Sequence, residues 1–155
     1  RAGSLRAEGG EALPADSWLQ GIADRWRRLR PHVPLTTRID CGAPAPRLVA
    51  DTTLEQAIHN LINNAADASP DGIECEAGIA SDALVVRVLD RGPGLPEGFA
   101  PTAGRAADAA HKGLGIGLLL ASGAVERCGG HIAFSPRPGG GTIATLTLPL
   151  ASLQP

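Results

Sequence analysis

The spacing of apolar side chains along the chain predicts three helices. The first runs to about Arg30, and Asp16 or Ser17 is expected to cap its start. The second is expected over residues 53–68 and the third over 114–128, where apolar residues also recur at helical spacing. The apolar face of the first helix consists of Trp18, Ile22, Trp26 and Leu29.

Strands are predicted where short apolar or alternating segments lie between turn residues. Residues 73–80 and 83–89 are expected to form a hairpin around Ser81-Asp82, and the nearly continuous apolar run in its second strand indicates a central position in the sheet. In the last strand, Ala144, Leu146 and Leu148 alternate with more polar residues, which is typical of a half-buried strand. This last strand is predicted at 142–148, and the remaining strands are predicted at 33–40, 47–50 and 131–135.

The second helix has an unusual polar face. Asparagine is a poor residue for a helix interior, so Asn60 and Asn64 on one face, with Gln56 and Asp67 beside them, suggest a binding site. An ordinary amphipathic helix facing solvent explains this segment equally well. The opposite, apolar face consists of Leu54, Ile58, Leu61, Ile62 and Ala65.

Composition limits the function classes. With 155 residues, 43% hydrophobic content, a net charge of −2 and 3% aromatics, the chain suits one folded domain and offers neither a basic surface nor a stacking platform for nucleic acid. No apolar run is long enough to span a bilayer. We expect a linker over 1–14, one domain over 15–150 and a tail over 151–155. Because the chain starts at Arg1, a longer parent protein is expected.

The cysteines give no metal or redox motif. Cys41, Cys75 and Cys128 are far apart and odd in number, and no Cys-x-x-Cys spacing occurs. Reduced, partly buried thiols in a cytoplasmic protein are therefore expected, although a redox role stays open.

Two glycine motifs flank the chain's expected binding site. Asp90 ends the apolar strand and is followed by Gly92 and Gly94; a buried carboxylate there needs a donor, such as the amino group of adenine, and glycines let a ligand approach the backbone. Gly139–Thr142 forms a tight turn before the last strand, and the Thr142 hydroxyl is expected beside Asp90. Each segment, taken alone, is also compatible with an ordinary turn.

A third glycine-rich run, His111–Leu118, opens the last predicted helix. Free N–H groups at a helix start, with the Lys112 charge beside them, suit phosphate oxygens. A dinucleotide-binding motif would directly follow a strand, whereas this run follows a long loop, so that interpretation is disfavoured. The loop over 95–112 is expected to act as a mobile lid.

In this order, the four segments resemble the catalytic, ATP-binding domain of sensor histidine kinases, in the GHKL superfamily. Leu54–Ala68 is similar to the N box, Asp90–Gly94 to the G1 box and Gly113–Gly117 to the G2 box, with Gly139–Thr142 as the last glycine motif. The sequence of residues 60–69 and 90–96 is most similar to the redox-responsive RegB/PrrB kinases. The resemblance implies a Bergerat fold: an α+β two-layer sandwich with a mixed sheet of about five strands and three main helices on one face.

The same resemblance implies ATP and Mg²⁺ as cofactors and assigns residues to them. Asn64 would ligate Mg²⁺, Asn60 would lie near the phosphates and metal, and Asp90 would accept a hydrogen bond from the adenine amine. Asn60, Asn64 and Lys112 are the expected catalytic residues. The nucleotide-binding set implied by the resemblance is Asn60, Asn64, Asp67, Asp90, Gly92, Gly94, Leu95, Lys112, Gly113, Leu114, Gly115, Ile116, Gly117, Leu118 and Thr142.

One position separates hydrolysis from transfer within the superfamily. Hydrolytic members such as gyrase carry a glutamate where Asn60 stands, and an amide cannot act as a base at neutral pH. Transfer of the γ-phosphoryl group to a separate histidine is therefore favoured. The alternatives are a GHKL ATPase, a serine kinase of the anti-sigma-factor type, and a regulatory module that senses ATP without transferring phosphate.

No histidine of this chain has the sequence context of a phosphoacceptor. His32 lies between two prolines, His59 and His131 are expected to be structural, and His111 is a candidate phosphate contact in the lid, where Phe99 is the assigned F-box aromatic. The expected partners are the parent's own dimerisation and phosphoacceptor domain and, indirectly, a response regulator. The resemblance implies a cytoplasmic domain, monomeric by itself, in a dimeric parent anchored in the inner membrane.

Overall fold

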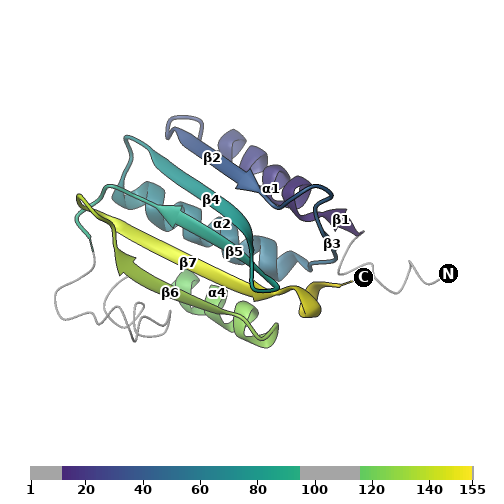
Figure 1. Ribbon diagram of the computed structural model, residues 1–155. Coiled ribbons are helices and arrows are strands. Elements are labelled where there is room, and N and C mark those ends of the chain that lie inside the picture. The colour runs from purple at the N-terminus through teal and green to yellow at the C-terminus, as the bar shows by residue number, and fades with distance from the viewer. Residues whose placement is uncertain (1–11, 95–115, 155) are drawn as a thin grey trace.

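A five-stranded mixed sheet forms one layer of the protein in the computed structural model, which describes residues 12–94 and 116–154 (Figure 1). The strand order is β2-β4-β5-β7-β6, with β2 and β4 parallel and every other pair antiparallel. β5 is thus the central strand, as its apolar sequence predicts. The strands are β2 (Leu35–Asp40), β4 (Ile73–Ala80), β5 (Ala83–Leu89), β6 (His131–Pro136) and β7 (Thr142–Pro149).

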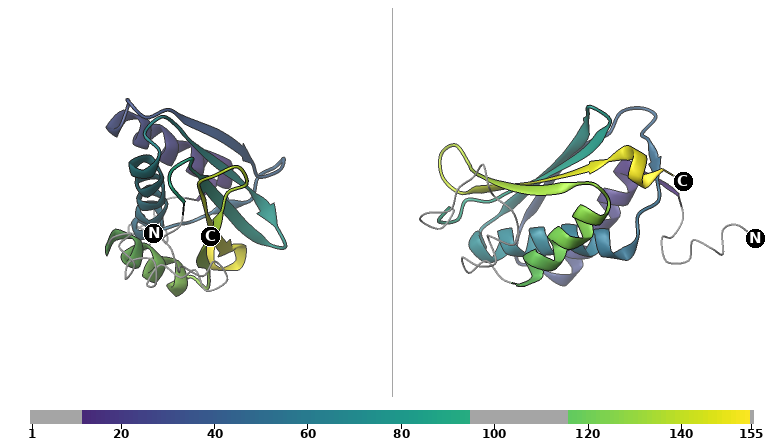
Figure 2. Two further views of the ribbon diagram at one scale, coloured as in Figure 1. Left: turned by 90° about the vertical axis from the view of Figure 1, so that its left-hand side faces the viewer. Right: turned by 90° about the horizontal axis from the view of Figure 1, so that it is seen from below.

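Three helices form the second layer and cover one face of the sheet (Figures 1 and 2). They are α1 (Ala15–Leu29), α2 (Thr52–Ala68) and α4 (Ile116–Arg127). The core lies between the layers, because the apolar faces of the helices meet the inward residues of the strands. This α+β arrangement confirms the fold class expected from the sequence. No helix in the described ranges combines the length and apolarity needed to cross a bilayer.

The first helix begins earlier than the sequence predicts. Pro14 occupies the N-cap position and provides no side-chain cap, so the assignment of Asp16 or Ser17 as the cap is wrong. The chain passes directly from a short strand into the helix, and Ala15 N donates to Pro46 O at 2.8 Å. Asp16 lies instead in the first turn, where its charge interacts favourably with the helix dipole.

The ends of the described chain pack against the domain. β1 (Leu13–Pro14), inside the expected linker, pairs with β3 (Arg47–Leu48). The 3₁₀ helix Leu150–Leu153 overlaps the expected tail, and Leu153 is buried while its carbonyl accepts a hydrogen bond from Val49 N at 2.7 Å. At these positions the chain belongs to the fold, because backbone groups there are paired and an apolar side chain is buried.

The second helix presents its predicted apolar face to the core. Asp51 caps it through a side-chain hydrogen bond from Leu54 N at 3.1 Å. It also contacts α4 and α1, and at α1 Trp26 Nε1 donates to Asn63 Oδ1 at 2.9 Å. Trp18, Ile22 and Trp26 of α1 are buried as predicted, whereas Leu29, at the end of that helix, is 67% exposed. The buried residues of α2 are Leu54, Ala57, Ile58, Leu61, Ile62, Ala65 and Ala66.

Candidate functional site

A small apolar cavity lies between α2 and the central part of the sheet. It has a volume of about 70 Å³, and three of its polar lining residues, Asn64, Asp90 and Thr142, were assigned to the nucleotide site from the sequence. They come from a helix, from the end of β5 and from the start of β7, so the fold brings together residues that are far apart along the chain. The apolar lining consists of Leu61, Ala65, Ala68, Val88, Phe134 and Ala144.

Asp90 is held in one orientation by the backbone. The residue is buried, and its Oδ1 accepts hydrogen bonds from Gly92 N at 2.9 Å and Thr142 N at 3.2 Å. Its own N–H donates to Thr142 O at 3.0 Å, which continues the pairing of β5 with β7. Oδ2 accepts no hydrogen bond from any residue of the described ranges. Because Asp90 also lines the cavity, this carboxylate oxygen is suited to accept a hydrogen bond from a ligand.

Asn64 contributes the second unpaired polar group of the cavity. Its Nδ2 is buried and has no hydrogen-bond partner within residues 12–94 and 116–154. Among the described residues no hydrogen bond to Nδ2 fixes the orientation of this amide, so either its oxygen or its nitrogen can face the cavity. An amide oxygen is a hard ligand of the kind that Mg²⁺ prefers, and the residue therefore fits the metal role that the resemblance implies.

The polar face of α2 is divided between separate places. Asn60 lines a second hollow of about 310 Å³ between α2 and α4, and its Oδ1 accepts from Gln56 Nε2 at 3.3 Å. Asp67 is exposed and pairs with Arg30 of α1 at 2.9 Å. Asn64 alone of these four residues lines the small cavity. The structure thus brings Asn64 to Asp90 and Thr142, but it directs Asp67 toward α1.

The glycines at the site serve the packing of its backbone. A methyl carbon at Gly92 would lie 2.6 Å from Ala68 O, so a side chain there would collide with the end of α2. A methyl carbon at Gly141 would overlap Asp90 O, and Gly141 also has a φ of +111°. Gly94 has a φ of +91°, and a methyl carbon added there would lie 3.8 Å from Gly141 O, an ordinary contact distance. At Gly92 and Gly141 the missing side chain therefore lets one backbone segment of the protein approach another.

Several assigned residues lie outside the described residues. These are Leu95, Lys112, Gly113, Leu114 and Gly115, together with Phe99, His111 and the expected lid. Ile116, Gly117 and Leu118 form the first turn of α4, as expected for a glycine-rich run that opens a helix.

The sequence did not point to a polar network beside the cavity. Ser69 is buried at the end of α2, where its Oγ donates to Gly72 O at 2.8 Å and accepts from Arg91 N at 3.1 Å. Arg137 Nη1 donates to Asp90 O at 3.2 Å, and Arg137 Nη2 pairs with Glu74. A serine just after a helix is a weak signal for such a role. Arg137 has no local signal, because its partners lie on other strands.

Among the residues that the structure describes, no histidine or cysteine lines the small cavity. Burial, and then the nearby Arg25 charge, lowers the pKa of His59, whose Nδ1 lies 3.3 Å from Asn63 Nδ2. His32 and His131 are exposed. Burial raises the pKa of all three thiols, that of Cys75 to about 11, so the reactive thiolate is disfavoured at neutral pH.

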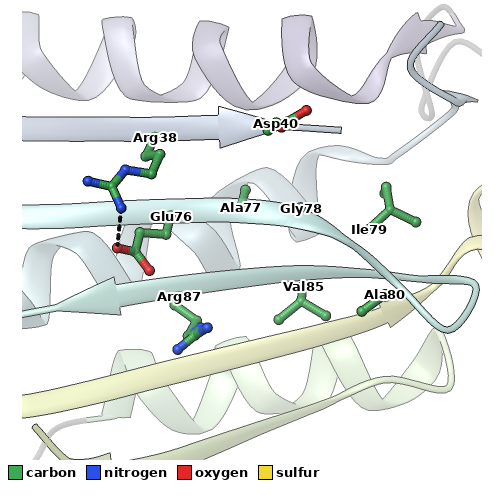
Figure 3. A pocket seen from close by; sticks show the side chains of 9 residues that line it. All are labelled: Arg38, Asp40, Glu76, Ala77, Gly78, Ile79, Ala80, Val85 and Arg87. Carbon is green, nitrogen blue, oxygen red and sulfur yellow. Dashed lines mark ion pairs between the residues drawn. The ribbon is translucent and has the colours of Figure 1, made fainter. Parts of the chain in front are cut away.

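A larger hollow lies on the sheet face that no helix covers. It has a volume of about 320 Å³ and lies across β2, β4 and β5 (Figure 3). Its charged residues include Arg38 and Glu76, whose closest charged atoms are 3.8 Å apart, and Arg87. Because no residue assigned from the sequence lines it, the smaller cavity is the better candidate site.

Comparison with known proteins agrees with this architecture. The profile of a family described as histidine kinase-, DNA gyrase B-, and HSP90-like ATPase matches residues 50–152. The sensor protein KdpD of Mycobacterium tuberculosis is 36% identical over 101 residues, which is 61% of this chain and 12% of KdpD. This chain therefore spans only a small part of the length of that relative.

Two solved structures share the fold at low sequence identity. The ATP binding domain of PrrB from Mycobacterium tuberculosis superposes with a TM-score of 0.70 and 22% identity, covering 90% of this chain and 96% of that one. Full-length ShkA in complex with AMPPNP gives a TM-score of 0.67 and 24% identity, covering 94% of this chain and 33% of ShkA. Both likenesses concern the fold alone.

Proposed function

The chain belongs to the family of histidine kinase-, DNA gyrase B- and HSP90-like ATPases, and we propose that it binds Mg-ATP and transfers the γ-phosphoryl group to a histidine of a separate domain. Within the family it is a catalytic ATP-binding domain of the sensor histidine kinase type, the type used in two-component signalling. The observation that carries the proposal is that Asn64, whose Nδ2 is buried and unpaired among the described residues, and the oriented carboxylate of Asp90 line one apolar cavity.

Asp90 supports adenine recognition. With Oδ1 bound by two backbone N–H groups, Oδ2 is left to accept a hydrogen bond from an exocyclic amine. The apolar lining, from Leu61 to Ala144, suits the faces of a purine. That full-length ShkA, which contains a related fold, was solved in complex with AMPPNP, an analogue of ATP, agrees with a nucleotide ligand.

Asn64 supports the metal role. When bound, Mg²⁺ neutralises phosphate oxygens and so favours phosphoryl transfer. The protein's part is to offer the Asn64 amide oxygen from a rigid helix, one turn beyond Asn60. In this proposal Lys112 and the glycine-rich run from Gly113 to Leu118 hold the phosphates, and Gly92, Gly94, Leu95 and Thr142 lie around the base.

Transfer is favoured over direct hydrolysis by Asn60. Its amide has no basic lone pair that takes up a proton at neutral pH, so it cannot activate water as a carboxylate does. The acceptor histidine, the dimerisation domain that carries it and the response regulator are partners proposed for the whole protein. We further propose a cytoplasmic domain in a membrane-anchored dimer of the redox-responsive RegB/PrrB subtype. Because the pKa values of its three thiols are raised, we do not assign redox chemistry to the cysteines of this domain.

Binding is tested by titrating the protein with ATP in the presence and absence of Mg²⁺. Asn64→Ala is expected to weaken Mg-ATP binding by about tenfold or more, because one metal ligand is lost. Its melting temperature should stay the same or rise, since the amide it removes is buried and unpaired.

The matched control is Asn63→Ala, one residue earlier on α2. This variant removes the hydrogen bond to Trp26 and should lower the melting temperature while leaving Mg-ATP affinity unchanged. Unchanged Mg-ATP binding in Asn64→Ala would contradict the metal role.

Transfer is tested by adding radiolabelled Mg-ATP and a purified helical domain that carries the acceptor histidine. Acid-labile phosphate on that domain is the expected result. Nucleotide binding without transfer, under conditions where an intact parent kinase is active, would favour a regulatory module that senses ATP. Release of free phosphate at a comparable rate without the acceptor would favour an ATPase.

A further inference from the structure

We infer that Arg137 and Arg91 are positioning residues that set the nucleotide selectivity of the site by fixing the backbone on both sides of Asp90. The inference rests on the proposed role of Asp90 as the acceptor for the adenine amine. Neither arginine lines the small cavity. Each acts through the peptide groups that orient the Asp90 carboxylate.

The two arginines connect the same two segments in opposite directions. Arg137, in the turn before β7, donates through Nη1 to Asp90 O at 3.2 Å. Arg91, next to Asp90, donates through Nη1 to two carbonyl oxygens of that turn, Pro138 O at 3.1 Å and Gly140 O at 3.2 Å. Because each segment supplies the donor for the other, a shift of either segment would break contacts at both arginines.

Arg137 is itself anchored to the sheet. Its side chain is only 9% exposed, and Nη2 pairs with the carboxylate of Glu74 on β4. The planar guanidinium therefore connects β4 with the end of β5 through its two terminal nitrogens. Its backbone N–H donates to Gly141 O at 3.0 Å, which closes the turn. A lysine has the charge but lacks the rigid fork, so it cannot reproduce both contacts.

The turn held in this way determines the direction of the carboxylate. Gly141 packs against Asp90 O, and the next residue, Thr142, donates its N–H to Asp90 Oδ1 at 3.2 Å. If the turn moved, that N–H would leave Oδ1, and Gly92 N–H alone would hold the carboxylate, which would then be less restricted in rotation. Oδ2 would then no longer be fixed toward a ligand, and discrimination between an amino and an oxo group on the purine would fall.

The test compares Mg-ATP with Mg-ITP, which carries a 6-oxo group in place of the 6-amino group. The wild-type protein should prefer ATP by about tenfold or more, as expected for one hydrogen bond to a charged acceptor. In Arg137→Ala and Arg137→Lys the preference should fall by about fivefold or more, with the affinity for ITP changing less than about twofold. Arg91→Ala should change the preference in the same direction.

Arg38→Ala is the matched control. Arg38 also faces a glutamate of β4, Glu76 at 3.8 Å, but it is 83% exposed, lies on the uncovered sheet face (Figure 3) and does not contact the Asp90 loop. Its ratio of ATP to ITP affinity should equal that of the wild type. Melting curves for every variant define the temperature at which all titrations are made, so that only folded protein is compared.

The possible outcomes distinguish a failure of the positioning role from a failure of the proposed function. Equal weakening of ATP and ITP in both Arg137 variants, or no change in either, would overturn the positioning role. Wild-type protein that binds both nucleotides equally would overturn the adenine role of Asp90, and the inference with it. Wild-type protein that binds neither would contradict the proposed function itself.

Discussion

The two ends of β5 are built in opposite ways. At its start, Ser81 and Asp82 form the hairpin turn from β4, and Ala80 pairs with Ala83 next to it. At its other end, Asp90 and Arg91 are held by residues that are 22 to 52 positions away in the sequence. The hairpin turn is formed by local residues and receives one distant backbone hydrogen bond, from Leu150 N to Asp82 O at 3.0 Å. The site end, in contrast, is held by two distant segments, Ser69 and residues 137–142.

This difference explains where binding groups are left available. The backbone of the hairpin is paired through the β4–β5 ladder and the hydrogen bond from Leu150 N to Asp82 O, and none of its described side chains has a buried, unpaired polar atom. At the site end, the network holds the Asp90 carboxylate through Oδ1, while Asn64 Nδ2 is buried without a partner among the described residues. Because the site end of β5 is built from several segments, it can leave particular atoms available to a ligand. A change in any of those segments can disturb it.

The largest effect should come from Gly141→Ala at the site end. The methyl group would overlap Asp90 O, and the φ of +111° is unfavourable for alanine. We expect a loss of about 3 kcal/mol or more of unfolding free energy, with weakened ATP binding. Gly140→Ala is the control, since Gly140 has a φ of +112° but nothing within 4 Å of the added carbon. Equal losses in urea unfolding would show that the contact with Asp90 is unimportant.

Ser69→Ala should have the next largest effect. It removes the hydrogen bonds of Ser69 Oγ with Gly72 O and Arg91 N, and it should cost about 1–3 kcal/mol because those backbone groups lose a partner. ATP affinity should fall as well. Ser135→Ala, a half-buried serine on β6, is the control for urea unfolding and nucleotide titration. A Ser69 variant that binds ATP normally would limit that residue to a structural role.

At the hairpin end, the double variant Ser81→Asn with Asp82→Gly should be stabilising. Both residues have positive φ values, 50° and 61°, which Asn-Gly adopts more readily in a two-residue hairpin turn. We expect a gain of about 1 kcal/mol in unfolding free energy. ATP affinity should not change, because the turn lies at the far end of the strand. A change in ATP affinity would mean that the two ends are coupled.

The smallest effect concerns pH at the site end. The hydrogen bond from Arg137 lowers the pKa of Glu74 below its ordinary value of 4.5. As the pH falls below about 4.5, Glu74 therefore takes up a proton in the unfolded chain before it does so in the folded one. The stabilisation that the ionised Glu74 gives to the folded state is complete at neutral pH and is lost in acid. The difference in melting temperature between wild type and Glu74→Gln should shrink from pH 7 to pH 3.

Glu76→Gln is the control for that measurement, because Glu76 faces the exposed Arg38 at 3.8 Å and should give a smaller difference. A Glu74→Gln difference that is independent of pH would contradict an ionic role for the pair with Arg137.

The sequence predicted most of the secondary structure because the signals are local. The hairpin strands 73–80 and 83–89 begin and end where expected, since alternation and turn residues mark them. The cap of α1 was predicted wrongly, because the pairing of β1 with β3 starts that helix earlier than any capping residue indicates. Tertiary contact overrode the local preference.

The candidate site residues show the same difference between local sequence signals and tertiary contacts. Asn64, Asp90 and Thr142 were predicted as site residues because amides in a helix, an acid at the end of an apolar strand and a glycine turn are each unusual in their local setting, and the fold places all three at one cavity. Asp67 shares the helix face of Asn64, yet it pairs with Arg30 of α1. Periodicity gives the face of a residue but not the element that lies opposite it.

By itself, the sequence determined the elements, the central place of β5 and the identity of the atoms available for chemistry, because periodicity and side-chain type are local properties. Only the tertiary structure decided that Glu74, Arg91 and Arg137 hold the Asp90 backbone, and that Oδ2 and the Asn64 amide remain unpaired. Hydrogen bonds across 22 to 52 residues depend on strand order and on how the chain closes, and no local pattern encodes them.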